Sequence, residues 1–544
     1  MKTHHRMLWR PAVLPSVLLA LAAGLAHAAP DATRGQALYV EGRLPDGRAL
    51  QARRAESPDM AGAAAACVQC HRRSGLGDQE GLLRIPPITA ASLFAPGQPL
   101  TLRRTTTGSA PPGTRVESRS AYTPETLARA LRSGVDPDGQ ALSRWMPRYD
   151  LDDAAVADLL AWLERLGPVG DTVLRGLDGT RLHLATIVTP DAPADRREVV
   201  ETTLAAWARQ QTFGQVRVAL HVWTLTGPPA EWAVQLEQHL RAQPVYAVVS
   251  GAGAAQWAPV EAFCEAQALP CVLPSIDQVP PTTAAQPRHH TLYLSEGALA
   301  EARVAARALD TLGTPPSRLH LWFDTELGAA AAREFQALQT RTDSAVPVRL
   351  RDLRVQPLAP GEPLGAAQEL VVAWLATPQV GALLAARGAA GDDSRPSLWL
   401  SAHLAPPEAL DALGLPAVWR PKVRWASVQN TPTQFHAAAA TGLKPWLRTL
   451  GLDPASATVL QGEVYAAAFF FTDALRRSRG AWSVEHVLER LESGVNNRAA
   501  AGRFVRLSLG PGQRIAAQVG QMQGWAAPLH QTLVPLSPVL NANR

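Results

Sequence analysis

From residue 182 to about 530, short apolar runs alternate with longer runs that have helical spacing. Buried apolar strands separated by helices form right-handed βαβ units, so this alternation predicts mostly parallel sheets. A stretch of about 350 residues is too long for one sheet, and we therefore expect two α/β lobes. The strand candidates are 182–188, 216–223, 246–250, 271–274, 319–323, 370–375 and 398–401, and the helical candidates are 196–209, 231–241, 260–268, 299–312 and 329–339.

Composition excludes several classes of protein. The 544 residues carry a formal net charge of +5, a small excess that gives nucleic-acid binding little support. With 47% hydrophobic residues and 15 tryptophans, the chain is not wholly disordered. No apolar run beyond the first 30 residues is long enough to span a membrane, which excludes a multipass membrane protein.

The first 28 residues have the pattern of a secretory signal. Basic residues in the first ten positions precede an apolar stretch at 11–25, and Ala26-His27-Ala28 supplies small residues around a cleavage point. We expect cleavage after about Ala28, export to the periplasm, and no remaining transmembrane segment. In that oxidising compartment, cysteine thiols either form disulfides or bind a cofactor covalently.

The first cysteine pair lies in Cys67-Val68-Gln69-Cys70-His71, a C-x-x-C-H motif. Two thiols at this spacing match the two vinyl groups of haem, and the adjacent His71 then becomes the proximal iron ligand. A zinc site or a thioredoxin-like pair also uses C-x-x-C. His71 is the only histidine between residues 30 and 167, and the preceding segment is alanine-rich rather than a strand. The motif predicts one covalent haem c.

A low-spin electron carrier needs a sixth ligand, and two methionines are available in this region. Met60 lies seven residues before Cys67 on the chain that approaches the proximal side, so we argue against it. Met146 lies in Trp145-Met146-Pro147, where proline prevents a helix and a loop can present the sulfur. We expect Met146 as the distal ligand. The alternative is an ordinary core or surface methionine.

Further residues between 31 and 167 match the pattern of one family. They are Gly35 and Tyr39 in an N-terminal helical run, the glycine-bearing loop Ser74-Gly75-Leu76-Gly77, Pro86 and Pro87, and an amphipathic run at 151–166 behind the acidic start 150–153. In these features the segment resembles the class I c-type cytochromes.

That resemblance implies an all-α cytochrome c domain over 31–167. It implies that the carbonyl of Pro86 or Pro87 accepts the N–H of the proximal imidazole, and the sequence leaves open which one. It also places Trp162 near Gly35, although a core role fits this tryptophan equally well. The stretch 93–122 departs from the family and reads as an insertion at the haem edge.

The second cysteine pair, Cys264 and Cys271, falls at the end of a predicted helix and the start of the next strand. A short disulfide is feasible after export, and two separately buried thiols are the alternative. The adjacent pair His289-His290 favours an exposed connector over a metal site, since neighbouring side chains seldom point at one ion.

The second body resembles the type I periplasmic solute-binding proteins of the branched-chain amino-acid receptor type. The match lies in 245–251 as a strand and glycine loop, 269–275 as the next strand, and 292–296 as the segment that enters the second lobe. Ligands of open parallel sheets bind at the carboxyl ends of the strands. Candidate cleft residues at these ends are Ser250, Gly251, Ala252, Ser275, Glu296 and Asp324, and Trp223 or Trp257 line the cleft or fill the core.

These features predict a signal peptide at 1–28, a cytochrome c domain at 31–167, a linker at 168–181, a binding-protein-like domain at 182–530 and a C-terminal tail at 531–544. We expect single-electron transfer to or from a periplasmic dehydrogenase or respiratory cytochrome, with an attached module for a solute or partner. Because His and Met close both axial positions, we expect no catalysis. The alternative is a solute receptor in which haem reports redox state or stabilises the fold. A third class, an enzyme acting at the haem, needs an open iron site, and no G-x-S-x-G or G-x-G-x-x-G motif supports an enzyme in the second body.

Overall fold

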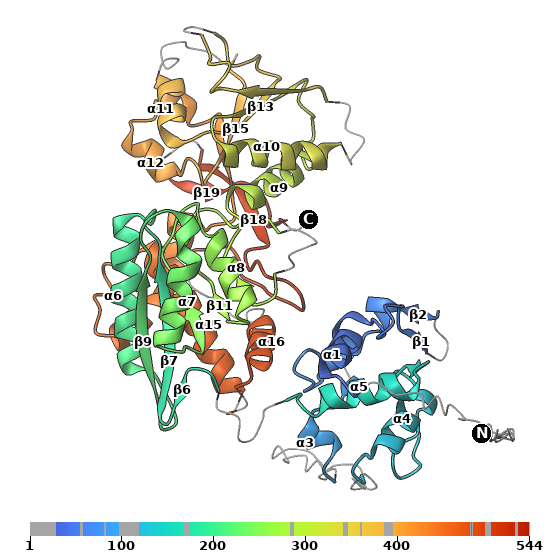
Figure 1. Ribbon diagram of the computed structural model, residues 1–544. Helices are drawn as coiled ribbons and strands as arrows, with labels where there is room; N and C mark the ends of the chain where they lie inside the picture. Colours follow the sequence, from blue (N-terminus) through green and yellow to red (C-terminus); the bar gives the residue numbers. More distant parts are fainter. Residues whose placement is uncertain are drawn as a thin grey trace, which may run out of the picture. The chain divides into compact units, whose positions relative to one another are not determined.

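The computed structural model describes residues 29–54, 58–80, 83–96, 119–167, 174–282, 288–340, 346–359, 362–385, 395–478, 480, 482–494, 502–527 and 531–542. The chain divides into two units, Met1–Gly167 and Pro168–Arg544 (Figure 1). This division falls at the end of the segment expected to be a cytochrome domain. The predicted signal at 1–28, residues 168–173 of the predicted linker and residues 97–118 of the predicted insertion lie outside the described residues.

The first unit combines short helices with small antiparallel strands. Its helices are α1 (Ala32–Glu41), η1 (Gly62–Ala65), α2 (Val68–His71), α3 (Ala90–Leu93), α4 (Pro124–Ser133) and α5 (Asp153–Leu163). Strands β2 (Met60–Ala61), β1 (Gln51–Arg53) and β5 (Arg148–Tyr149) form one sheet, and β3 (Asp78–Glu80) pairs with β4 (Leu83–Ile85). An all-α description of this unit is therefore too simple. Ala52 and Tyr149 are buried opposite each other on β1 and β5. Their buried backbone N–H and C=O groups need hydrogen-bond partners, and pairing of the two strands supplies them.

Helices α1 and α5 pack against each other in the first unit. A Cβ atom on Gly35 would lie 2.0 Å from the Asp158 carbonyl oxygen, so only glycine permits this approach. The Tyr39 and Trp162 rings lie 6.3 Å apart between centroids, which places Trp162 at the same helix contact. Helix α5 begins where the acidic run predicts, because the Asp152 side chain accepts a hydrogen bond from the Ala155 N–H.

The first lobe of the second unit is a sheet of order β12-β11-β10-β7-β9-β8. Pairing is parallel except at β8 and at β6, which adds to β7. Helices α6 and α15 cover one face, and α7 and α8 cover the other. The elements are β6 (Leu177–Asp178), β7 (Arg181–Val188), α6 (Ala194–Gln210), β8 (Thr212–Phe213), β9 (Val216–Thr224), η2 (Pro229–Glu231), α7 (Trp232–Ala242), β10 (Ala247–Val249), α8 (Ala258–Ala266), β11 (Cys271–Val272), β12 (Thr291–Leu292) and α15 (Val459–Arg477).

The second lobe is a sheet of order β14-β13-β15-β16-β17-β18-β19, with β20 also paired to β18. The first five strands are parallel, and β18 pairs antiparallel with β17, β19 and β20. Its elements are α9 (Ala298–Leu309), β13 (Leu319–Phe323), α10 (Glu326–Gln339), β14 (Val348–Asp352), β15 (Leu370–Trp374), α11 (Thr377–Ala385), β16 (Ser397–Ser401), α12 (Pro407–Ala412), η3 (Ala417–Trp419), β17 (Val423–Ser427), β18 (Val519–Trp525), β19 (Leu533–Pro535) and β20 (Leu540–Asn541). The prediction of two mostly parallel α/β lobes is confirmed.

The chain passes between the two lobes three times. It enters the second lobe after β12 and returns through α13 (Pro432–Thr441) and α14 (Leu443–Thr449) to α15 and α16 (Val484–Gly494) of the first lobe. It crosses again before β18, with bridges at Gln429↔Phe504 and Tyr293↔Ile515 along the way. Residues 531–542, expected as a tail, instead contain β19 and β20, because the exposed edge of β18 offers unpaired backbone groups to the chain end.

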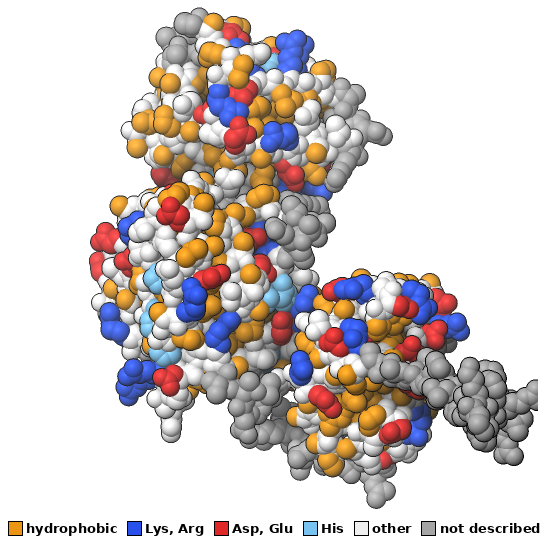
Figure 2. All heavy atoms as spheres, viewed as in Figure 1, with side chains coloured by type: hydrophobic (Ala, Val, Ile, Leu, Met, Phe, Trp, Pro, Cys, Tyr) orange, Lys and Arg blue, Asp and Glu red, His pale blue; other side chains and the backbone are white. Residues whose placement is uncertain are grey.

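Basic and acidic side chains are interspersed over the face of the second unit seen in Figure 2. The small positive net charge is therefore not gathered into one basic surface on that face. The structure contains no helix long and apolar enough to cross a membrane among the residues it describes.

Candidate functional site

A cavity in the first unit brings together residues that are distant in sequence. Its lining includes Cys67, Cys70 and His71 from the C-x-x-C-H motif, and Met146 from a turn 75 residues further on. The remaining lining residues are Arg54, Met60, Ala64, Ala65, Ala66, Gln69, Pro147 and Tyr149. The lining is thus largely apolar, and it includes sulfur and imidazole groups together with Arg54 and Gln69.

The helical turn at α2 places the side chains of the C-x-x-C-H motif close together. Cys67 has α-helical backbone angles, and its carbonyl oxygen accepts from the N–H groups of Cys70 and His71 at 3.2 and 2.9 Å. Residues at i, i+3 and i+4 of a helix share one face. The two thiols and the imidazole therefore project to the same side of this turn.

The His71 ring is held in one tautomer. Its side chain is buried, and its Nδ1 lies 3.0 Å from the Pro86 carbonyl oxygen. A carbonyl oxygen only accepts, so Nδ1 carries the proton and Nε2 keeps its lone pair. Burial lowers the pKa of His71, which favours the neutral ring that a metal requires.

The choice between the two prolines is settled by this geometry in favour of Pro86. Gly77 makes the approach possible, because a Cβ atom there would lie 2.1 Å from the Ile85 carbonyl oxygen and 2.8 Å from that of Pro86. Gly77 also has a φ of +72°, which favours glycine. The glycine loop after the motif therefore allows the 85–86 backbone to reach the histidine.

The two motif cysteines are not joined in a disulfide. Burial raises the pKa of the Cys67 thiol to about 12, which disfavours its thiolate form. Two thiols, a neutral imidazole and a thioether sulfur around apolar walls fit a covalently attached haem, and Arg54, whose buried Nε has no hydrogen-bond partner, adds a cation for an anionic group.

Met146 is positioned by the chain on both sides of it. Its N–H donates to the Ser143 carbonyl oxygen at 3.0 Å, and the following Pro147 leads into β5, which pairs with β1. Met60 lines the same cavity, although the sequence argument places it away from the distal face. Pairing of β2 with β1 brings Met60 there, a non-local contact that spacing along the chain does not reveal.

A second cavity lies between the lobes of the second unit. Its first-lobe wall carries Arg196 and Glu463, and its second-lobe wall carries His403. Arg196 pairs with Asp277 at 2.5 Å, and Arg503 pairs with Glu463 at 2.5 Å. Desolvation lowers the pKa of His403. The other lining residues are Pro274, Ile276, Tyr293, Leu294, Ser295, Gly297, Ala402, Pro406, Glu408, Gln429, Val459 and Phe504.

None of the six predicted cleft residues lines this cavity. Ser250 and Ala252 are buried, and a Cβ on Gly251 would meet the Trp257 ring at 2.7 Å, so these residues serve packing. Ser275 comes nearest, since its hydroxyl donates to Glu463.

The other two predicted residues are already engaged. Glu296 pairs with Arg303, and the Asp324 carboxylate accepts from the Ala376 N–H at 3.1 Å. Trp223 and Trp257 belong to the core rather than the cleft. Asp277 and His403 follow the strand ends of β11 and β16, where the strand-end rule applies, but Arg196, Glu463 and Arg503 reach the cavity from α6, α15 and the last lobe crossing.

The structure joins Cys264, near the end of α8, to Cys271, at the start of β11, in a disulfide. This bond ties a helix to the strand that follows it. Both cysteines belong to the buried cluster formed with α7 and α8, and neither lines the inter-lobe cavity.

Comparisons with known proteins follow the same division of the chain. The sequence pattern of the Cytochrome c family matches residues 61–167, and no curated protein matches the chain. Three solved structures are similar to it, each with a TM-score of 0.46. A leucine-binding protein from Thermotoga maritima is 14% identical and covers 66% of this chain and 99% of its own.

The second is a branched-chain amino acid ABC transporter protein from Thermus thermophilus with bound valine, which is 13% identical over 67% of this chain and 97% of its own. The third is a solute-binding protein of an ABC transporter from Rhodopseudomonas palustris in complex with p-hydroxybenzoic acid, 13% identical over 67% of this chain and 98% of its own. The segment from 61 to 167, which contains C-x-x-C-H and Met146, thus matches the Cytochrome c family, and such a match implies covalently attached haem.

Proposed function

We propose that the protein is an exported c-type cytochrome with one haem that transfers single electrons, and that its second unit binds a small solute or a redox partner. One observation carries the proposal: Cys67, Cys70, His71 and Met146 line a single cavity inside the segment that matches the Cytochrome c family. The periplasm is the expected compartment, and a dehydrogenase or a respiratory cytochrome is the expected partner.

Each residue has a defined task in this proposal. The Cys67 and Cys70 sulfurs form the thioether bonds, and His71 presents the Nε2 lone pair because Nδ1 donates to Pro86. That hydrogen bond fixes the ring and raises its basicity as a ligand. When bound, haem supplies a one-electron iron couple. Met146, which lines the same cavity as His71, would supply a soft sulfur ligand that favours the reduced state.

Closed axial positions favour electron transfer over catalysis at iron. With both His71 and Met146 as ligands, the reduced protein is expected to bind no carbon monoxide. Binding of carbon monoxide would instead favour an enzyme or sensor with an open iron site.

The proposal is tested on the exported full chain. The reduced-minus-oxidised spectrum should show a c-type α band, and haem should remain attached to the chain after denaturation. Replacement of Cys67 and Cys70 by Ser should abolish the attached haem. The matched control is the Cys264→Ser, Cys271→Ser variant, which should retain haem because this pair lies in the other unit. A wild-type chain without attached haem contradicts the proposal.

A solute receptor that uses haem as a redox reporter or structural element is the second candidate. The inter-lobe cavity favours it, because Arg196, Asp277, Arg503 and Glu463 place two ion pairs on its walls. A small polar solute exchanges with such pairs more readily than an apolar one does. Stabilisation of the second unit by a solute, without electron exchange with periplasmic dehydrogenases, would support the receptor over the electron carrier.

A further inference from the structure

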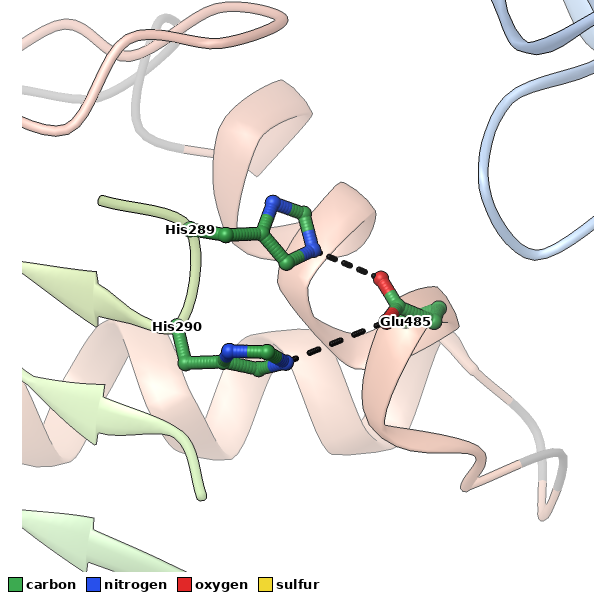
Figure 3. Close-up of side chains that lie close together, drawn as sticks. All are labelled: His289, His290 and Glu485. Carbon is green, nitrogen blue, oxygen red and sulfur yellow. Dashed lines mark hydrogen bonds and ion pairs between the residues drawn. The ribbon is translucent and has the colours of Figure 1, made fainter. Parts of the chain in front are cut away.

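The segment just before β12 carries two adjacent histidines that face a common partner. His289 and His290 were expected in an exposed connector, but their side chains are only 19% and 12% exposed. Figure 3 shows both rings turned toward Glu485 from the neighbouring helix. The expectation of an exposed connector is therefore wrong. Glu485 is the second residue of α16, and packing of this helix beside β12 brings the three residues together.

The three side chains present ligand atoms at one point. His289 Nε2 lies 2.8 Å from Glu485 Oε2, and His290 Nε2 lies 3.9 Å from Glu485 Oε1. One ligand atom from each residue falls within 4.8 Å of the other two. Such spacing leaves room for one ion with bonds of about 2.1 Å after small side-chain adjustments.

His290 is oriented for metal binding. Its Nδ1 lies 3.2 Å from Glu265 Oε2, and since a carboxylate oxygen accepts, Nδ1 carries the proton. Its Nε2 is buried and has no hydrogen-bond partner. A carboxylate behind a histidine, with the second nitrogen left open, is the arrangement that supports metal-bound histidines. Glu265 itself is anchored, because it also accepts from the backbone N–H groups of His289, His290 and Thr291.

His289 must change its tautomer when an ion binds. An Arg514 guanidinium nitrogen lies 3.0 Å from His289 Nδ1 and only donates, so Nδ1 accepts and Nε2 carries the proton toward Glu485. Coordination through Nε2 moves this proton to Nδ1 by exchange with solvent and breaks the contact with Arg514. The arginine keeps its bonds to the His289 carbonyl oxygen at 2.7 Å and to Glu492 at 2.6 Å.

The charges around the pair favour a cation. Two carboxylates, Glu265 and Glu485, contact the histidines directly. Arg514, whose guanidinium contacts His289, is already paired with Glu492. Two imidazole nitrogens and one carboxylate suit zinc or a similar transition metal, whereas magnesium and calcium require oxygen ligands.

We propose that His289, His290 and Glu485 form a binding site for one Zn²⁺-class divalent ion in the second unit, which clamps the segment before β12 to the start of α16. The ligands are His290 Nε2, His289 Nε2 and a Glu485 oxygen, and water completes the coordination because the Glu485 side chain is 33% exposed. This site is independent of the haem cavity, and its test does not depend on the redox function.

The experiment uses the full exported chain and Zn²⁺ alone. After equilibrium dialysis, metal analysis should find one bound Zn²⁺ per chain. His290→Ala and Glu485→Gln should each lose this Zn²⁺. Glu265→Gln, which keeps an oxygen acceptor for the backbone, should weaken binding by about 10 to 100-fold through loss of the carboxylate behind His290. His436→Gln is the matched control, because His436 is an exposed histidine on α13.

X-ray absorption at the zinc edge of the wild-type protein gives a second readout that does not rely on the variants. Scattering from two imidazoles supports the site, including the case in which a variant fails to fold. Zinc with no imidazole neighbours, or Zn²⁺ binding that survives both His290→Ala and Glu485→Gln, overturns the proposal. Absence of Zn²⁺ binding to the wild-type chain also overturns it.

Discussion

At the scale of single residues, two methionines line the cavity beside His71, and only one can complete the axial pair. We assign Met146, so Met146→Leu should leave the sixth iron position open, lower the reduction potential and allow carbon monoxide to bind the reduced protein. Met60→Leu, a change of similar volume in the lining of the same cavity, should have none of these effects. Visible spectra with and without carbon monoxide check the assignment, and the reverse pattern would make Met60 the ligand.

Glu301 in α9 is a buried carboxyl group at the base of the second lobe. Its Oε2 accepts from the Ser401 hydroxyl at 2.5 Å and the His403 N–H at 3.0 Å. Burial raises the pKa of Glu301 from 4.5 to about 8, against the effect of these hydrogen bonds and of Arg503. The folded state therefore holds a proton that the unfolded state releases above its ordinary pKa.

This difference predicts how stability changes with pH. The contribution of Glu301 is fully present below about pH 4.5 and is lost as the pH rises to about 8. Glu301→Gln should flatten the fall in the urea midpoint across this interval, because glutamine does not titrate. The same substitution at the exposed Glu326 should leave the slope unchanged. An unaltered slope in Glu301→Gln contradicts the prediction.

At the scale of elements, the contact between α1 and α5 depends on the missing side chain of Gly35. Gly35→Ala would place its Cβ within 2.9 Å of Trp162 Cβ as well as against the Asp158 carbonyl. Overpacking of this kind costs about 1–3 kcal/mol, so the variant should lower the urea midpoint of the first unit. The control is Gly313→Ala, because a Cβ atom at this position meets open space. This variant should leave the urea midpoint of the second unit unchanged.

What sequence reasoning recovers depends on how local each feature is. The C-x-x-C-H motif spans one helical turn, so the relation of Cys67, Cys70 and His71 follows from spacing alone. The strands and helices of the two lobes follow from apolar periodicity in the same way. The place of Met60 in the cavity and the small strands of the first unit depend on pairing between separate segments of the chain. Apolar periodicity does not specify such pairing.

The inter-lobe cavity and the histidine pair are even harder to predict from local sequence patterns. Glu463 and Arg503 reach the cavity from segments about 270 and 310 residues after Arg196, a separation that no strand-end rule covers. His289 and His290 gain their partner only when α16 packs beside β12. Both sites are built by chain crossings rather than by any one βαβ unit.

At the scale of the whole molecule, the path of the chain through the second unit sets an order of assembly. The first sheet lacks α15 and α16 until the second lobe has been made, and the second sheet lacks β18 until α16 has been made. Because synthesis proceeds from the N-terminus, neither lobe can complete its core before nearly all residues have been made. The second unit of a chain with this architecture therefore reaches its final packing only after its last strands have been synthesised.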